Sequence, residues 1–457
     1  MARILKTAGR IAFIILGAKL LERAIKESCK TKNKANRKIR IDWSNSRYIP
    51  TQLLVWKKPG VSQSDFEGWI RDNLLGYGDL SQSSTCEHCD NSMQLWVGDD
   101  VSTFISERVA KSGTSKTDLP PQGGGDSIAC FSYNLIIDLP EQSSCAPENL
   151  KRFIPPKAPI DNDIEPITIA VFDTGLADSI KSLYTVSLPS CKPGGDRGWN
   201  FAYNNADTSD DYPSRHGTVV TSFIIDQAHK FGKRKIKILP VKIHNSTGKS
   251  DLFSVLCGFA YASKSGANII NASFGFYGSK GSNAPQILFE FVKEHLTKHN
   301  ILLIAAAGNV NAEETIGLAS TLPVRDLDKH PFYPACLSQQ LPNVLAITTA
   351  SEAENKVSPS QNYSQNIVDF GIYCDSVVAD DYRFAHPLIT GDMVLGSSYA
   401  TPIATGIIAQ HWTDLMAGFT PGNIDKSVLL ERLRTLTLVA NNSLLAPLLR
   451  DGNIAKK

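Results

Sequence analysis

The chain has 457 residues, of which 42% are apolar and 20% charged, a balance typical of globular proteins with a sizeable core. Its formal net charge of only +2 argues against a nucleic-acid partner. The nine cysteines are odd in number and widely spaced, which excludes a disulfide-dense scaffold and favours a reducing compartment. We therefore expect a cytoplasmic location, with membrane association or secretion as alternatives.

The first 40 residues combine basic side chains with a short apolar run. Arg3, Lys6 and Arg10 precede the run 11–16, and Lys19 follows closely. No small-residue cleavage site follows before the next charges, and the run is too short for an ordinary transmembrane helix. We predict an amphipathic helix, packed or lying on a membrane surface, and then a solvated basic arm, over residues 1–40.

Residues 41–140 predict a small α+β domain. Its strands and helices are expected at Gln52–Trp56, Ser64–Tyr77, Met93–Val97, Val101–Ala110 and Phe131–Leu139. Ser64 is the candidate N-cap of the first helix, and the Pro-Gly-rich segment 120–125 is predicted to be a loop or linker.

A proline-rich stretch between Pro140 and Pro166 follows, and we interpret residues 141–160 as an inter-domain linker. Over residues 161–457, apolar strands alternate with helical stretches. This pattern predicts an α/β domain with a parallel sheet covered by helices on both faces. Strands are expected at Ile167–Phe172, Lys237–Val241, Asn268–Ala272, Ile301–Ala306 and Val344–Thr348.

Three motifs lie where such a sheet collects chemical groups, at strand ends and helix starts. The first predicted strand runs directly into Asp173-Thr174-Gly175. His216, followed by Gly-Thr, precedes an apolar helical stretch, and Ser398 stands in Gly-Ser-Ser-Tyr-Ala-Thr-Pro before another. A carboxylate, an imidazole and a hydroxyl are the groups that nucleophilic catalysis by serine requires.

In this order the motifs resemble the signature blocks of the subtilisin-like serine proteases, the subtilases. Three further blocks agree with the family pattern, namely Ile270–Gly275, Ala305–Asn309 and Tyr333–Ala335. The resemblance covers roughly residues 160–440. It implies a subtilisin-like catalytic domain with serine endopeptidase activity, acting on protein or peptide substrates.

The resemblance also implies a role for each matching residue. Ser398 would attack the scissile carbonyl, His216 would take its proton, and Asp173 would orient the imidazole. The Asn309 side chain and the Ser398 backbone N–H would stabilise the oxyanion. The strand expected to pair with an extended substrate consists of Ser273, Phe274, Gly275 and Phe276.

Two departures from the family pattern affect these expectations. Ser397 stands where the family more often has threonine, and we choose Ser398 as nucleophile because it directly precedes Tyr-Ala-Thr-Pro. Residues 226–237 are basic and lack the Asn-rich loop that binds calcium in many secreted relatives. We therefore expect no metal or cofactor, with calcium at the oxygen-rich loop Asp207–Asp211 as the alternative.

Cys86 and Cys89 have the spacing of half a zinc site, but Cys130 and Cys145 offer no regular second pair, so we expect no metal there. The domain that contains them loosely resembles an inhibitory subtilase prodomain. It is either a chaperone and inhibitor removed by cleavage, or a permanent domain that docks a regulatory partner. For the whole chain, the alternative to an active protease is a catalytically silent binding module.

Overall fold

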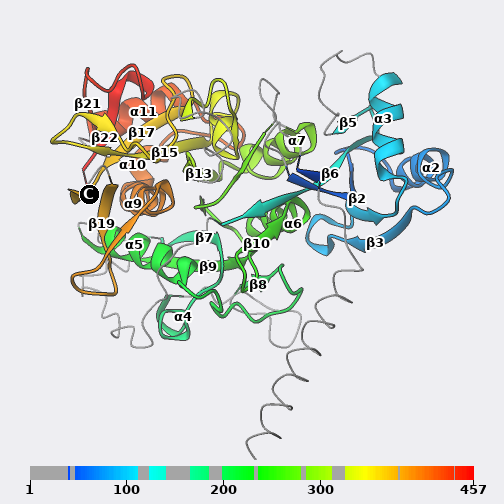
Figure 1. The fold of residues 1–457 in the computed structure, drawn as a ribbon, viewed down its shortest axis with the longest axis horizontal. Helices are drawn as coiled ribbons and strands as arrows, with labels where there is room; N and C mark the ends of the chain where they lie inside the picture. The colour runs from blue at the N-terminus through cyan, green and yellow to red at the C-terminus, as the bar shows by residue number, and fades with distance from the viewer. Residues whose placement is uncertain are drawn as a thin grey trace, which may run out of the picture.

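The computed structural model describes residues 40–41, 47–111, 123–139, 165–184, 198–230, 235–278, 285–310, 325–378, 381–436 and 438–456. The predicted amphipathic helix and the predicted linker lie outside the described residues. The described chain forms a small antiparallel unit beside a larger α/β unit (Figure 1). None of the described helices is long and apolar enough to cross a membrane.

The small unit, which we call the N-terminal domain, is a twisted antiparallel sheet with two helices. Its elements are β1 (Arg40–Ile41), β2 (Arg47–Lys57), α2 (Gln63–Asn73), β3 (Ser81–Thr85), the 3-10 turn η1 (Glu87–Cys89), β4 (Met93–Val97), α3 (Val101–Lys111), β5 (Gly123–Gly125) and β6 (Ala129–Asp138). Every predicted strand and helix of this region is present, while the strands β1, β3 and β5 were not predicted.

Two predictions in this domain were wrong in detail. The N-cap of α2 is Ser62, whose hydroxyl accepts from the Asp65 N–H at 3.1 Å, and not Ser64. Gly123–Gly125 is a strand and not a loop, because it pairs with the edge of β6. A Cβ at Gly123 would lie 2.2 Å from the carbonyl oxygen of Phe131, so these glycines permit the close approach.

The large unit, which we call the protease-like domain, is built on a ten-stranded, mostly parallel sheet. Its order is β21-β22-β17-β15-β13-β11-β7-β9-β8, and β16 pairs with β15. The strands are β7 (Ile167–Asp173), β8 (Trp199–Asn200), β9 (Ile236–Lys242), β11 (Ile269–Ala272), β13 (Leu302–Ala306), β15 (Val344–Ser351), β16 (Lys356–Val357), β17 (Val368–Tyr373), β21 (Val439–Asn441) and β22 (Asn453–Ala455). All five predicted strands belong to this sheet.

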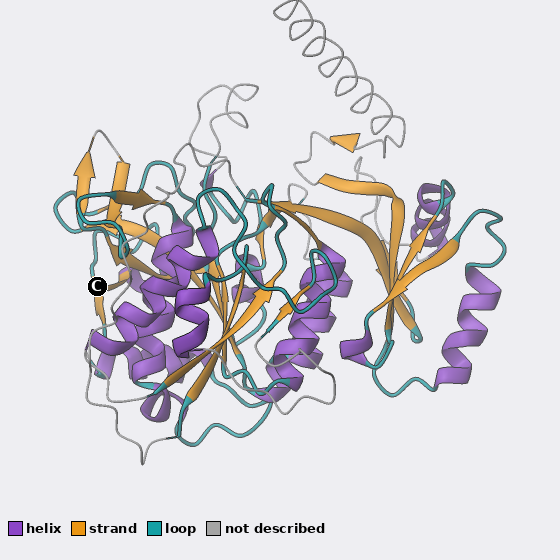
Figure 2. Cartoon of the chain, turned by 90° about the horizontal axis from the view of Figure 1, so that it is seen from below, coloured by secondary structure: helices purple, strands orange, loops and turns teal. Residues whose placement is uncertain are grey.

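Helices cover both faces of this sheet, as the sequence predicted (Figure 2). On one face α5 (His216–Lys230) and α9 (Ser397–Gln410) pack against Ile169 and Val171 of β7. On the other, α6 (Leu252–Lys264) and α7 (Gln286–His295) share a core with Phe172. Smaller elements are α4 (Asp178–Tyr184), α10 (Trp412–Met416), α11 (Lys426–Thr435) and the strands β12 (Phe276–Tyr277), β14 (Phe332–Tyr333), β18 (Ser376–Val378), β19 (Asp381–Ala385) and β20 (Met393–Leu395).

The two units share a sheet and a core. β10 (Lys249–Asp251) of the protease-like domain pairs antiparallel with β6 and so extends the N-terminal sheet. The Asn134 side chain accepts from the Phe253 N–H at 3.0 Å, at the start of α6. The rings of Trp56 and Phe291 lie 5.2 Å apart between β2 and α7. The N-terminal domain is therefore packed directly on α6 and α7.

Candidate active site

Three adjacent strands deliver side chains to one edge of the large sheet. β7 ends at Asp173, β11 ends just before Ser273, and β13 ends shortly before Asn309. These strands are parallel neighbours, so their carboxyl ends meet at the same edge. His216 and Ser398 reach this edge from the starts of α5 and α9, and the His216 ring lies 5.4 Å from that of Tyr399. The structure thus gathers the predicted catalytic residues.

Asp173 and His216 form a buried pair. Asp173 Oδ1 lies 2.8 Å from His216 Nδ1 and also accepts the Thr174 N–H at 2.8 Å. Both side chains are almost fully buried, with 1% and 2% exposure. Gly217 allows this approach, since a Cβ there would lie 2.4 Å from the Gly175 carbonyl oxygen. Because Nδ1 of His216 is bonded to Asp173, Nε2 is the ring nitrogen that can accept a hydrogen bond from a hydroxyl.

Burial lowers the pKa of His216, but the charge of Asp173 and the hydrogen bond that the imidazole donates to it outweigh burial and raise the pKa above its ordinary value. The neighbouring His244 differs, since burial lowers its pKa to about 3 and neither ring nitrogen has a partner among the described residues. Its ring packs edge-on against Phe274 at 5.6 Å. Of these two histidines, His216 therefore has the carboxylate partner that a general base needs.

Ser398 is the second residue of α9 and is 6% exposed. Its backbone N–H belongs to the first helical turn, where amides have no intrahelical acceptor. Within the described chain, His216 Nε2 makes no hydrogen bond, so the Ser398 hydroxyl is not bonded to it. Catalytic hydrogen bonds are often long without substrate and shorten in the complex.

The carbonyl of Ser398 depends on a residue outside its helix. In a regular helix it would accept from residue 402, but that residue is proline and has no N–H. Ser273 Oγ donates to this carbonyl instead, at 2.8 Å. Asn271 Nδ2 donates to Ser273 Oγ at 3.0 Å and so fixes the hydroxyl. The side chain of Ser273 therefore positions the start of α9, a role that the sequence did not predict.

Ser397 holds the Asn309 amide. Both the backbone N–H and the hydroxyl of Ser397 donate to Asn309 Oδ1, at 3.0 and 3.1 Å. The hydroxyl also accepts from the Gly308 N–H at 3.1 Å. With Oδ1 occupied, the Nδ2 group of Asn309 is the part of this amide left to donate to an oxyanion. The adjacent serine, noted in the sequence only as a departure from the family pattern, has this orienting contact.

The predicted substrate-binding strand leaves the sheet directly after β11. Ser273, Phe274 and Phe276 are buried, and Gly275 is half-buried. A Cβ at Gly275 would lie 2.3 Å from the Phe332 ring, so this position tolerates only glycine without rearrangement. Phe276 already pairs with Tyr333 between β12 and β14, so one edge of its backbone is occupied.

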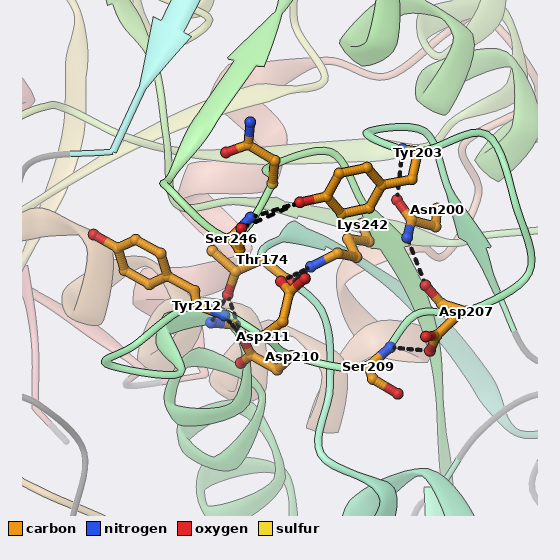
Figure 3. Close-up of polar contacts among 12 residues, drawn as sticks. Thr174, Asn200, Tyr203, Asp207, Ser209, Asp210, Asp211, Tyr212, Lys242 and Ser246 are labelled. Carbon is orange, nitrogen blue, oxygen red and sulfur yellow. Dashed lines mark hydrogen bonds and ion pairs between the residues drawn. The ribbon is translucent and has the colours of Figure 1, made fainter. Parts of the chain in front are cut away.

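A polar network that the sequence did not predict supports the Asp173 turn (Figure 3). Asp210 accepts from the Thr174 hydroxyl at 2.8 Å and from the Thr218 N–H and hydroxyl at 2.9 and 2.7 Å. Burial raises the pKa of Asp210, against the opposing effect of these hydrogen bonds. Lys242 is buried, donates to the Thr174 carbonyl and pairs with Asp211 at 2.6 Å.

This network includes the carboxylates that the sequence offered as a calcium alternative. The oxygens of Asp210 and one oxygen of Asp211 are engaged by protein donors, and Asp207 Oδ1 accepts the Ser209 N–H at 2.9 Å. Among the residues that the structure describes, no three or more His, Cys, Asp or Glu side chains are grouped so that they could hold a metal ion.

Comparison with known proteins agrees with this geometry. The family model of the subtilases matches residues 165–439. A subtilisin-like protease 3 of Plasmodium falciparum is 25% identical over 213 residues, which are 45% of this chain and 26% of that protein. A cell wall-associated protease of Bacillus subtilis is 35% identical over 112 residues, 23% of this chain and 12% of that protein. The match thus spans about a quarter or less of these curated relatives.

A solved structure is similar over most of the chain. The epidermin leader peptide processing serine protease from Staphylococcus aureus has a TM-score of 0.51 at 13% identity. The alignment covers 89% of this chain and 96% of that one. The likeness concerns the fold, and its coverage means that it extends beyond the protease-like domain.

Proposed function

This chain belongs to the subtilase family, and from that premise we propose that it is a serine endopeptidase acting on protein or peptide substrates. The observation that carries the proposal is the buried Asp173–His216 pair at 2.8 Å, beside the start of α9 where Ser398 stands. Three separate elements supply a hydroxyl, an imidazole and a buried carboxylate. Acyl transfer by a serine nucleophile requires all three groups.

The proposed reaction proceeds in two halves. His216 Nε2 takes the proton of the Ser398 hydroxyl as Oγ attacks the scissile carbonyl, and the imidazolium then protonates the leaving amine. Water attacks the resulting acyl-enzyme by the same proton route. Asp173 keeps the proton on Nδ1 and stabilises the imidazolium, consistent with the raised pKa of His216. This chemistry needs no cofactor.

The developing oxyanion would be bound by Asn309 Nδ2 and the Ser398 N–H. Ser397 holds Oδ1 of Asn309, which orients Nδ2, and the N-terminal end of α9 favours negative charge. A donor of this kind typically lowers the barrier by about 3–4 kcal/mol. An extended substrate would add to the backbone of Ser273–Gly275 as a further strand.

The N-terminal domain is proposed to control access to this site. Its last described residue, Leu139, donates to the Gly248 carbonyl at 2.9 Å. Gly248 lies against the Tyr212 ring, since a Cβ at this glycine would be 3.0 Å from it. The Tyr212 carbonyl in turn accepts from the N–H of Arg215, the residue before His216. The chain thus leaves this domain beside the loop that leads into the catalytic histidine, which supports an inhibitory role.

A fluorophosphonate probe tests the proposed activity, because it reacts only with a serine activated by its neighbours. We expect labelling of the full chain, before or after removal of the N-terminal domain, and mapping of the adduct to Ser398. Ser398→Ala should abolish labelling, while Ser397→Ala, which removes the adjacent hydroxyl, should retain it. Failure of the chain to label in either state would overturn the proposal in favour of a catalytically silent module.

A further inference from the structure

Three cysteines from the two domains meet at their interface, and we call them the thiol cluster. Cys86 and Cys89 lie at the two ends of the η1 segment, and Cys257 lies on α6. All three are buried, with 2%, 3% and 3% exposure. Cys257 lies one helical turn before Tyr261 on α6, and the His88 ring packs on Tyr261, which places the η1 segment over Cys257. The electrostatic influence of Cys257 and Cys89 on the pKa of the Cys86 thiol agrees with this placement. The triad chemistry uses none of them.

The position of η1 on α6 is fixed by contacts other than those of the sulfur atoms. The His88 ring packs edge-on against Tyr261 of α6 at 4.9 Å, and against Phe201 and Trp199 at 5.4 and 5.8 Å. Lys264 at the end of α6 forms an ion pair with Asp90 at 2.5 Å. These flanking contacts hold the segment that carries Cys86 against the face of α6 that carries Cys257.

We propose that Cys86 and Cys257 are a pair that forms a disulfide bond on oxidation and so fastens the N-terminal domain to the protease-like domain. The step is thiol–disulfide exchange with a low-molecular-weight disulfide. One protein thiolate displaces a small thiol to form a mixed disulfide, and the second displaces the other small thiol. Two protein thiols are oxidised, one disulfide is reduced to two thiols, and the protons pass to those thiols.

The surroundings of the thiol cluster determine when this exchange occurs. Burial raises the pKa of the Cys257 thiol, and the contact with Cys257 followed by burial raises that of Cys86. Exchange requires a thiolate, so raised pKa values and burial both slow the reaction of the docked and reduced cluster. The first step therefore takes place when η1 parts briefly from α6, and docking then brings the second thiol into range. Once formed, the bond is shielded by the same burial.

The consequence for the enzyme is that cleavage between the domains no longer releases the N-terminal domain. In a reducing compartment the thiols stay free, and release after cleavage is unhindered. Under oxidation the domain remains attached next to the loop that leads into His216. This consequence rests on the proposed protease function, whereas the bond itself does not.

Peptide mapping of the full chain carrying Ser398→Ala tests the bond without any contribution from catalysis. The protein is incubated with oxidised glutathione, its remaining thiols are alkylated, and it is digested and analysed by mass spectrometry without reduction. We expect a linked pair of peptides containing Cys86 and Cys257, which replaces the free Cys257 peptide and disappears after reduction. Cys257→Ser should remove the pair, and Cys336→Ser, at a buried cysteine elsewhere, should leave it.

Because the mapping uses a chain with its cysteines intact, it does not depend on whether a cysteine variant folds. Two results would overturn the proposal. One is a Cys86–Cys89 linkage with Cys257 fully alkylated. The other is full alkylation of all three thiols after an incubation in which a model dithiol peptide is completely oxidised. Either result leaves the fluorophosphonate test of protease activity unaffected.

Discussion

The hydroxyl of Ser397 orients the proposed oxyanion donor, since it donates to Asn309 Oδ1 and accepts from the Gly308 N–H. We expect Ser397→Ala to lower kcat about fivefold, the equivalent of one hydrogen bond of about 1 kcal/mol, with little change in KM. Ser397→Thr keeps the hydroxyl and should keep the rate. Equal rates for the alanine and threonine variants in steady-state peptide hydrolysis would contradict this role.

In the proposed reaction Asp173 sets both the rate and its pH dependence. Activity needs neutral His216, so it falls as the pH drops through the pKa of that imidazole, which Asp173 raises. In Asp173→Asn the raising effect is lost while burial still lowers the pKa. The acid limb of kcat/KM should therefore move to lower pH, and the plateau should fall about 10,000-fold. A pH profile measures both, and an acid limb that stays in place would show that Asp173 does not govern His216.

At this scale the sequence predicted the positions of Asp173, His216, Ser398 and Asn309, because each stands in a short motif at the end of a strand or the start of a helix. It could not predict that Ser397 donates to Asn309, or that Asp210 accepts from Thr174 and Thr218 next to Asp173 and His216. Those contacts depend on side-chain directions and on residues far apart in the chain, and no local pattern encodes either. The oxygen-rich composition of residues 207–211 was the only signal of the Asp210 network.

At the scale of elements, the junction between β11 and α9 fixes the position of Ser398, the proposed nucleophile. Pro402 removes one helical N–H, and Ser273 supplies the missing donor to the Ser398 carbonyl. Ser273→Ala leaves that carbonyl buried without a donor, so we expect the free energy of unfolding to fall by about 1–3 kcal/mol and kcat to fall with it. Ser222→Ala is the matched control, because the buried Ser222 hydroxyl donates to a carbonyl within its own helix, that of Thr218.

Denaturant unfolding and steady-state kinetics on the two serine variants check this expectation together. If Ser222→Ala and Ser273→Ala lose the same stability and activity, the hydrogen bond to the Ser398 carbonyl has no special part in placing the nucleophile.

The main elements were predictable, and two of the strands that the sequence did not predict share one cause. Long apolar strands such as β7 and β15 carry their own signal in the sequence. β5 and β10 are three residues each, with glycine or polar side chains, and they exist because β6 offers them an edge. Pairing between segments so distant in the chain depends on tertiary structure, so local composition did not reveal it.

At the scale of the whole molecule, the two domains share one apolar core that includes Trp56 and Phe291. A domain docked in this way, with its chain leaving beside the His216 loop, supports processing in the proposed linker. On incubation of the purified chain we expect a cut between residues 140 and 165, with the new ends identified by mass spectrometry. Ser398→Ala should remain whole. A stable, active, uncut chain would instead favour a permanent regulatory domain.

The most direct test of the central claim, that Ser398 is the nucleophile of a peptidase, is hydrolysis of a diverse peptide library. The wild-type chain and Ser398→Ala are each incubated with the library, with and without removal of the N-terminal domain, and new peptide ends are counted by mass spectrometry. We predict new ends with the wild-type chain alone, and their flanking residues would define the specificity. Equal counts for both chains, or no cleavage by the wild-type chain in either state, would contradict the claim.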